Sequence, residues 1–499
     1  MDAQRLSDLG DQFFAAFRLD EALDAYSRAL ALVPRHAGAR AGLDAILERA
    51  RTDRPNPRLI ELMLAAYADP GANWDAVGWG AAHQLVVGWP NPPDPERLAR
   101  DELLRAFLTK SLNRNPALER HLLALRTAVA RSLVSGSATS ELETLAGALA
   151  EQAWQNEYLW PDDPSVTGLA AAMFRPPNDA RPAQLEEQRL AASIPSLAPI
   201  ADGVSKAVAA MYEANPYPRW THLPRRPPVD VRAALGRDFP HAGPVSPPDG
   251  PHLEVLMPGA GTGQHPLSVA ASYVGARVTA LDLSRASLAY GKRMAADLGI
   301  DNIAFLHGDI LDLPTLGRRF DHAECVGVLH HMSDPKAGLL AISAVLRWGA
   351  FLRLGLYGEA ARRTVVKARR EIALAGLSAD LNGLREFRRR VLAGEWRALA
   401  SLVESEDFWS ASLLRDLCFH VQEHRFTVAR VRALLEGTGL RFLGFEFNAG
   451  SVQRSVDAPA IALYRIRFPA ERTLSDLSRW EQLERERPDL FPGYAFVCQ

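Results

Sequence analysis

The sequence predicts an α/β protein with a largely parallel sheet in its C-terminal half and an all-α N-terminal region. Three observations predict this fold class. From Leu253 to Pro335, short apolar runs alternate with a glycine-rich turn and with acidic strand ends. Between residues 98 and 160, apolar residues recur at i, i+3, i+4 and i+7, which is typical of helices with one buried face. The first 50 residues carry a helix-pair pattern of their own.

The glycine-rich turn carries the strongest functional signal. The apolar run at 253–257 predicts a strand, and PGAGTGQH at 258–265 predicts a turn into a helix. Glycine tolerates φ > 0 and lets the backbone approach a ligand, and this turn has three, Gly259, Gly261 and Gly263. Asp282 ends the next apolar run, about 20 residues further on. That spacing is typical of a carboxylate that accepts hydrogen bonds from ribose hydroxyls, so we expect a nucleoside ligand.

The turn differs from two phosphate-binding loops. A dinucleotide-binding turn would have Gly or Ala at position 264, where this chain has Gln264. In a P-loop the last glycine is followed by Lys and then by Ser or Thr, whereas Gly263 is followed by Gln264 and His265. The loop therefore disfavours a dinucleotide or a nucleoside triphosphate.

Two further motifs, LHGDI (306–310) and FDHAECVGVLHHMSDP (320–335), complete a family pattern. Together with the turn, they make residues 250–357 resemble the class I S-adenosylmethionine-dependent methyltransferases. The resemblance implies a Rossmann-like sheet and S-adenosyl-L-methionine as the cofactor. It further implies that a helix and two strands of the same domain return between about 427 and 467.

The resemblance also implies roles for single residues. The three glycines would surround the methionine and ribose part of the cofactor, Asp282 with Leu283 would hold the ribose, and Asp309 with Ile310 would flank the adenine. One departure is Met257, because many members of the family carry an acidic residue two positions before the first glycine. Either another group holds the ammonium of the methionine part, or cofactor binding is weakened.

The N-terminus carries a second resemblance. From Ala3 to His36 the small and apolar residues resemble one tetratricopeptide repeat. A peptide-binding groove needs about three stacked units. We therefore expect a structural or self-associating role, with docking of a protein or peptide as the alternative.

The pattern along the chain predicts a domain order. We expect repeat-like helices at 1–50, a helical accessory domain at 51–200, a cofactor-covering linker at 201–250, a methyltransferase domain at 251–357 and 427–470, a helical lid insertion at 358–426 and a C-terminal extension at 471–499. An insertion after the fifth strand lies over the carboxyl edge of the sheet, where α/β proteins bind ligands. It would shape the acceptor pocket.

The linker before the first strand is stiffened by prolines and rich in aromatic residues. Aromatic faces suit a sulfonium cation and arginine suits a carboxylate, so Tyr212 and Arg219 are predicted to contact the cofactor. Asn215 and Tyr217 are predicted to contact the acceptor. The alternative is a proline-rich linker held by ordinary aromatic packing.

Histidines supply the candidate bases. Their unperturbed pKa of about 6.5 suits deprotonation of a methyl acceptor. The candidates are His331, His420 and His424, with Tyr357 as a lesser one. His330 and Glu423 are predicted to contact the acceptor, and at most one of the adjacent His330 and His331 should face the site. His420, Glu423 and His424 also match H-x-x-E-H, a zinc signature, but no third ligand can be named and we expect no metal.

Composition limits the partners. The net charge of −2 on 499 residues gives no general attraction to nucleic acid or anionic membranes. Three scattered cysteines and an N-terminus without an apolar leader predict a soluble, cytoplasmic protein. The predicted function is methyl transfer to a small-molecule or peptide or protein acceptor. The alternatives are a non-catalytic S-adenosylmethionine-binding protein and a scaffold that acts through the repeat.

Overall fold

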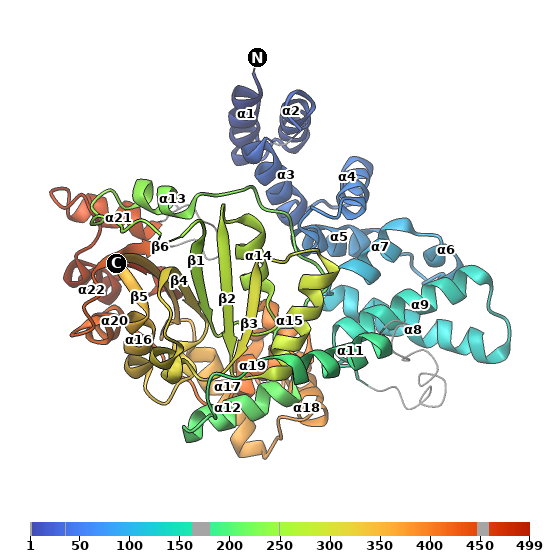
Figure 1. The fold of residues 1–499 in the computed structure, drawn as a ribbon. Coiled ribbons are helices and arrows are strands. Elements are labelled where there is room, and N and C mark those ends of the chain that lie inside the picture. Colours follow the sequence, from blue (N-terminus) through green and yellow to red (C-terminus); the bar gives the residue numbers. More distant parts are fainter. Residues whose placement is uncertain (1, 35, 162–179, 249, 447–458) are drawn as a thin grey trace.

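The computed structural model describes residues 2–34, 36–161, 180–248, 250–446 and 459–499. It is a mixed α/β protein with a helix-rich N-terminal region, as predicted (Figure 1). Nine helices precede residue 160: α1 (Ala3–Ala15), α2 (Leu19–Leu32), α3 (Ala37–Arg49), α4 (Pro57–Ala68), α5 (Trp74–Gly88), α6 (Pro95–Ala99), α7 (Glu102–Lys110), α8 (Pro116–Ser135) and α9 (Ser140–Gln155). Their apolar faces share one core that runs from Ala3 to Trp160, so the repeat-like helices and the following helices pack as one region.

The first three helices pack closely around Tyr26, which is fully buried. A Cβ at Gly10 of α1 would lie 2.5 Å from the Tyr26 ring, and one at Gly42 of α3 would lie 2.2 Å from it. The hydroxyl of Tyr26 donates to Asp11 at 2.6 Å. Glycine thus lets three helices close on one aromatic ring. At the turn between α1 and α2, Phe17 is 96% exposed.

The C-terminal half contains a seven-stranded sheet with the order β3-β2-β1-β4-β5-β7-β6. Its strands are β1 (Leu253–Pro258), β2 (Ala276–Asp282), β3 (Ile303–His307), β4 (Phe320–Val326), β5 (Leu346–Tyr357), β6 (Phe442–Glu446) and β7 (Gly493–Cys498). The first five strands are parallel, and β7 runs antiparallel to both β5 and β6. The strand order reverses between β1 and β4, and ligands of open α/β sheets bind at the carboxyl ends of the strands at such a point.

Helices cover both faces of this sheet. They are α13 (Val231–Asp238), α14 (Gln264–Ser272), α15 (Arg285–Asp297), α16 (Pro335–Ala344), α20 (Val428–Leu435), α21 (Pro459–Arg467) and α22 (Leu477–Glu486), with the 3-10 turns η2 (Ile310–Leu316), η3 (Leu329–His331) and η6 (Pro488–Leu490). Leu256 and Ala323 belong to the core on one face, whereas Met257 and Val255 belong to the core on the other.

The C-terminal boundary of the sheet differs from the sequence expectation. The second returning strand was expected before residue 467, and residues 471–499 were expected to be an extension. Residues 459–467 instead form the helix α21, and the last strand is β7, inserted between β5 and β6. The physical reason is pairing: Tyr494, Phe496 and Cys498 are buried in the sheet core, so the chain end completes the domain.

The segment between β5 and α20 is a helical insertion, hereafter the insertion. It contains α17 (Arg363–Ala375), α18 (Leu381–Leu392), η4 (Arg397–Glu404), η5 (Glu406–Phe408) and α19 (Ala411–Phe419). Its core includes Leu159 from the N-terminal region. The carboxylate of Glu119 on α8 accepts two hydrogen bonds from Arg388 on α18, at 2.7 and 2.5 Å. The insertion is therefore anchored on the N-terminal helices as well as on the sheet.

Two helices link the N-terminal region to the sheet, α11 (Ala180–Ser193) and α12 (Gly203–Ala214). Figure 1 shows α12 at one end of the sheet, and Tyr212 of α12 hydrogen bonds to Asp416 of α19. Most of the sequence RPPNDARP (175–182), whose prolines predict a break between helices, lies outside the described residues. None of the helices in the described ranges is long and apolar enough to cross a membrane.

Candidate active site

The turn between β1 and α14 lies where the strand order reverses. Gly259, Gly261 and Gly263 have φ of 75°, 53° and 88°, a left-handed backbone that other residues rarely adopt. A Cβ at Gly261 would lie 2.8 Å from the carbonyl oxygen of Tyr217. The turn therefore needs glycine for its backbone conformation and for the close approach of the preceding segment.

Asp282 lies at the carboxyl end of β2, beside this turn. Its Oδ2 accepts a hydrogen bond from the Gly261 amide at 2.8 Å, and its Oδ1 accepts one from the Ser284 amide at 2.9 Å. Burial raises the pKa of Asp282 to about 6, although both amides oppose the shift. The carboxylate is thus held rigidly, with further lone pairs for a ligand.

Asp309 follows β3 and begins η2. Its Oδ1 accepts from the Leu311 amide at 3.0 Å. Its Oδ2 is buried and finds no hydrogen-bond partner among the described residues. Because a buried acceptor without a donor is costly, this oxygen is suited to accept from a ligand amino group.

The segment between α12 and α13 is fastened over the glycine turn. The Thr262 amide donates to the Tyr217 carbonyl at 3.2 Å, and the Trp220 indole donates to the Thr262 carbonyl at 3.2 Å. The Thr262 hydroxyl donates to the Pro218 carbonyl, and the Tyr290 hydroxyl donates to the Trp220 carbonyl. This segment covers the place where a ligand of the turn would lie.

These parts enclose a cavity of about 260 Å³. Its wall includes Ser205, Val208, Tyr212, Tyr217, Met257, Gly259, Gly261, Gln264, His265, Asp282, Leu283, Asp309, Ile310, Glu324, Val328, His331, Tyr357 and Asp416. A second cavity of about 590 Å³ shares Gln264, His265, Glu324 and Val326 with the first. It extends to Glu48, Asp75 and Trp79 of the N-terminal helices and to Glu406 of the insertion.

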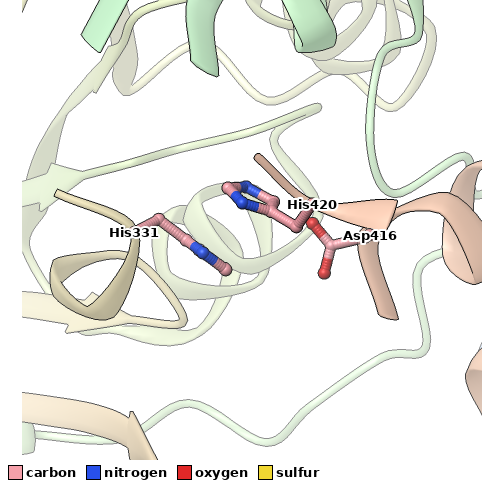
Figure 2. Close-up of side chains that lie close together, drawn as sticks. All are labelled: His331, Asp416 and His420. Atoms are coloured by element: carbon pink, nitrogen blue, oxygen red, sulfur yellow. The ribbon is translucent and has the colours of Figure 1, made fainter. Parts of the chain in front are cut away.

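A buried cluster of polar side chains closes one end of the first cavity. His331 comes from η3, whereas Asp416 and His420 come from the insertion, and Figure 2 shows their side chains pointing toward one another. The rings of His331 and His420 stack with centroids 3.6 Å apart. The Tyr212 hydroxyl donates to Asp416 Oδ1 at 2.5 Å, and His420 Nε2 lies 3.1 Å from that hydroxyl. The insertion thus completes the cavity wall.

Hydrogen bonds fix the tautomers of both imidazoles. The Gln422 amide donates to His420 Nδ1 at 3.1 Å, which leaves the proton of a neutral His420 on Nε2, facing Tyr212. His331 Nδ1 lies 2.7 Å from the Gln422 carbonyl, so it carries the proton there. Its Nε2 is buried and has no partner within the described part of the chain. His331 therefore presents a lone pair in the cluster.

Burial sets the protonation states of this cluster. It lowers the pKa of His331 to about 4 and that of His420 to about 2. It raises the pKa of Asp416 to about 6 and holds the pKa values of Tyr212 and Tyr217 well above the usual range. At neutral pH both imidazoles are neutral, and His331 can accept a proton.

His331, Asp416 and His420 have ligand atoms within 4.8 Å of one another, close enough to share a cation. Their hydrogen bonds favour another description. The lone pair of His420 already accepts from the Gln422 amide, and Asp416 accepts from Tyr212. The donor set therefore fits a hydrogen-bonded chain from His420 through Tyr212 to Asp416 better than a metal centre.

The structure separates the sequence candidates into two groups. On the wall of the first cavity lie Tyr212, Tyr217, Gly259, Gly261, Asp282, Leu283, Asp309, Ile310, His331 and Tyr357. Gly263 begins α14 just behind the turn, and His420 contacts the wall through Tyr212. His330 is fully buried behind His331, with its ring 3.9 Å from that of Tyr357.

Arg219 and Asn215, which were predicted to contact the cofactor and the acceptor, lie outside the described wall of the first cavity. The Arg219 guanidinium lies 4.7 Å from the centre of the Trp154 ring, because a cation gains by stacking on an aromatic face. Asn215 ends α12, and its side-chain amide donates to the Met211 carbonyl at 3.3 Å. Both side chains hold the linker in place, and neither belongs to the cavity wall defined by the described residues.

The H-x-x-E-H motif does not form a common face. Helix α19 ends at Phe419, so His420 and His424 lose the i, i+4 relation that a helix would give them. Glu423 forms a buried ion pair with Arg362, and His424 Nε2 lies 3.1 Å from the Met332 carbonyl. Glu423 and His424 therefore stabilise the insertion next to the site.

Two acidic residues of the cavity wall were not among the sequence candidates, Asp416 and Glu324. Asp416 belongs to no recognisable sequence motif. It reaches the cavity only through the packing of α19. Glu324 interrupts the buried strand β4, together with His322. Two polar residues on one face of a largely buried strand could have indicated from sequence that Glu324 belongs to a site.

The fold and the cavity define an α/β protein that binds its ligand at the switch point of a mostly parallel sheet. The methyltransferase domain family matches residues 255–349. Demethylmenaquinone methyltransferase of Clavibacter sepedonicus is 30% identical over 188 residues, which are 37% of this chain and 72% of that protein. The chain belongs to the S-adenosylmethionine-dependent methyltransferases, whose cofactor is S-adenosylmethionine.

The chain spans less than two thirds of the length of two further similar proteins and nearly all of a third. A protein of Synechococcus sp. (strain ATCC 27144 / PCC 6301 / SAUG 1402/1) that has no assigned function is 31% identical over 261 residues, 49% of this chain and 60% of that protein. Among solved structures, PKMT2 of Rickettsia typhi in complex with AdoHcy has 17% identity and a TM-score of 0.40, over 55% of this chain and 54% of that one. A methyltransferase in complex with the Haloferax volcanii activator Trm112 has 16% identity and a TM-score of 0.29, over 60% of this chain and 98% of that one.

The pKa of Asp282 predicts a pH dependence of cofactor binding. A pKa of about 6 means that the carboxyl is ionised at pH 7 and mostly protonated at pH 5. Only the ionised form offers all its lone pairs to ribose hydroxyls. The affinity for S-adenosylhomocysteine should be constant from pH 8 to pH 7 and fall about tenfold by pH 5. Calorimetric titrations across this range would measure it, and an equal decline in Asp282→Asn would show that another group is responsible.

Proposed function

We propose that this protein transfers the methyl group of S-adenosylmethionine to a small-molecule acceptor or a peptide side chain held beneath the insertion. The observation that carries the proposal is one cavity that combines the glycine turn, Asp282, the unpartnered Oδ2 of Asp309 and the unpartnered Nε2 of His331. The first three fit a nucleoside, and the last fits a base.

The nucleoside end would be held by three of these groups. Asp282 would accept hydrogen bonds from the ribose hydroxyls, while Asp309 Oδ2 would accept from the adenine amino group. Residues 217–220, which hydrogen bond to Thr262, would cover the ligand and exclude water. Tyr212 and Tyr217 on the cavity wall would place aromatic faces near the sulfonium.

His331 would act as the general base. When bound, the cofactor supplies an electrophilic methyl group on a positively charged sulfur. His331 Nε2 would accept the proton that the acceptor atom loses as it bonds to that carbon, while the carbon–sulfur bond breaks and its electron pair stays on the sulfur of the departing thioether. The Gln422 carbonyl, 2.7 Å from Nδ1, holds the ring in the tautomer that this transfer needs. A base with a pKa of about 4 is weak, which favours acceptors that become acidic during transfer.

The insertion would serve as a lid over the acceptor. It contributes Asp416 to the cavity wall and Glu406 to the adjoining second cavity. The second cavity meets the first at Gln264, His265, Glu324 and Val326, so it offers an acceptor a path to the cofactor. Helical residues of the N-terminal region line its far side, which would give that region a part in acceptor choice.

The repeat-like helices 1–50 would serve in self-association or protein docking. The exposed Phe17 at the α1 to α2 turn, with Leu32 and Val33 exposed by 59% and 45%, supports this role. Phe17 lies at the turn of the helical hairpin, whereas Leu32 and Val33 lie at the far end of α2. Exposed apolar side chains of this kind are suited to contact another protein.

The test follows tritium from methyl-labelled S-adenosylmethionine into a panel of phenols, thiols, amines and peptides. Wild-type protein should label at least one class. His331→Ala should lower that rate roughly tenfold to a hundredfold and leave the affinity for S-adenosylhomocysteine within about twofold. His252→Ala, in the loop before β1, is the matched control and should keep the full rate.

Two results would contradict the proposal. A wild-type protein that binds S-adenosylmethionine by calorimetry but labels no acceptor class would favour the non-catalytic binding protein. A wild-type protein that does not bind it would favour a scaffold that acts through the N-terminal helices.

A further inference from the structure

The chain lacks an acid at the position where its family usually has one near the methionine part of the cofactor. That position is Met257, on the wall of the first cavity. Leu256 pairs with Ala323, so the next residues along the two parallel strands, Met257 and Glu324, are also neighbours. Both belong to the same cavity wall. An acidic side chain therefore lies one strand away from the missing one.

The carboxylate of Glu324 is fixed by a dense set of donors. Its Oε1 accepts from Tyr273, His322 and Arg353 at 2.5, 2.9 and 2.8 Å. Within the described part of the chain, its Oε2 accepts from a single donor, His265 Nε2 at 2.9 Å. A carboxylate oxygen has two lone pairs, so Oε2 has room for one more donor on the side of the cavity that it lines.

The cluster around Glu324 holds one permanent positive charge for two buried carboxylates, and His265, 2.9 Å from Glu324 Oε2, adds a second charge only when it is protonated. Arg353 forms ion pairs with both Glu324 and Glu446, each at 2.8 Å, so two buried carboxylates share one guanidinium. His322 donates through Nε2, and its Nδ1 is buried without a partner in the described structure, as expected for a neutral imidazole. Burial would raise the pKa of Glu324, but Arg353 and the two histidines outweigh it and hold the pKa well below its usual range.

A buried excess of negative charge is costly unless a cation compensates it. The ammonium of an amino-acid ligand is such a cation, with three N–H donors. We propose that Glu324, supported by Arg353 and Glu446, binds the α-ammonium group of the cofactor's methionine part in place of the acid that Met257 lacks. This inference rests on the proposed cofactor site. It makes Glu324 a residue that selects for ligands with an amino-acid tail.

Two ligands separate this role from a general contribution to the site. S-adenosylhomocysteine carries the α-ammonium, whereas 5′-methylthioadenosine has the same nucleoside thioether without the amino acid. Calorimetric titration of Glu324→Gln should show at least about a tenfold loss of affinity for S-adenosylhomocysteine. The affinity for 5′-methylthioadenosine should stay within about twofold. Asp282→Asn is the matched contrast, because loss of the ribose acceptor should weaken both ligands.

A second variant protects the test against damage to the buried cluster. Met257→Glu in the Glu324→Gln background returns an acid to the strand next to position 324 and should recover most of the affinity for S-adenosylhomocysteine. Equal losses for both ligands in Glu324→Gln, or no loss for either, would overturn the assignment. If the wild type binds neither ligand, the proposed cofactor site itself fails and the assignment with it.

Discussion

Asparagine in place of Asp282 is expected to lower the affinity for S-adenosylhomocysteine by about 100-fold to 1000-fold. A hydrogen bond to a charged group is worth about 1.5–3 kcal/mol, and the ribose would lose two charged acceptors. Each 1.4 kcal/mol corresponds to a factor of about ten in affinity. Asparagine also gives up one acceptor oxygen, so it cannot accept from both the Gly261 and the Ser284 amides as Asp282 does.

Calorimetric titration of the purified variant measures this loss. Asp301→Asn is a suitable control because Asp301 is exposed before β3, and this variant should bind like the wild type. A loss of less than about fivefold in Asp282→Asn would mean that the ribose is not held at the end of β2.

The candidate residues at the strand ends could be selected from sequence because their determinants are local. The three glycines, Asp282 and Asp309 each lie at the end of a strand that the apolar pattern already reveals. In a parallel sheet the carboxyl ends of neighbouring strands meet at one edge. The family resemblance selected these residues, and the parallel strands explain why they meet at one edge. Ten of the candidate residues lie on one cavity wall.

The other end of the site could not be predicted this way. Asp416 reaches the cavity because the insertion folds back on α12, where Tyr212 bonds to it across 204 positions of the chain. Arg219 was misplaced because the sequence does not show that Trp154 lies beside it. The H-x-x-E-H match also failed to predict a shared face. Its histidines share a face only in a helix, and α19 ends just before His420.

Strand β7 could not be located from sequence because a long stretch of chain separates it from β6. The residues described between β6 and β7 include the helices α21 and α22, so the last strand lies about 50 residues after β6. Its antiparallel pairing with β5 and β6 depends on long-range contacts that no local pattern reports.

The ion pair between Arg388 and Glu119, which anchors the insertion on the N-terminal helices, is expected to contribute strongly to stability. Arg388 is 3% exposed and its guanidinium lies 5.0 Å from the centre of the Trp409 ring, while both its end nitrogens donate to Glu119. Removing one partner of a buried ion pair leaves a buried charge without compensation, which costs about 3–5 kcal/mol. Arg388→Met is therefore expected to lower the unfolding midpoint by about 3–5 °C. Differential scanning calorimetry would measure the shift.

The double variant Glu119→Leu/Arg388→Met decides whether the unpaired charge is the cause. Replacing both partners by apolar side chains removes the buried charge altogether, so most of the lost stability should return. A double variant as unstable as Arg388→Met would instead point to lost packing of the arginine against Trp409 and Phe408. The same pair connects the N-terminal helices to the insertion that carries Asp416 and His420. Arg388→Met should therefore also weaken the hydrogen bond between Tyr212 and Asp416, which ties the accessory region to the geometry of the site.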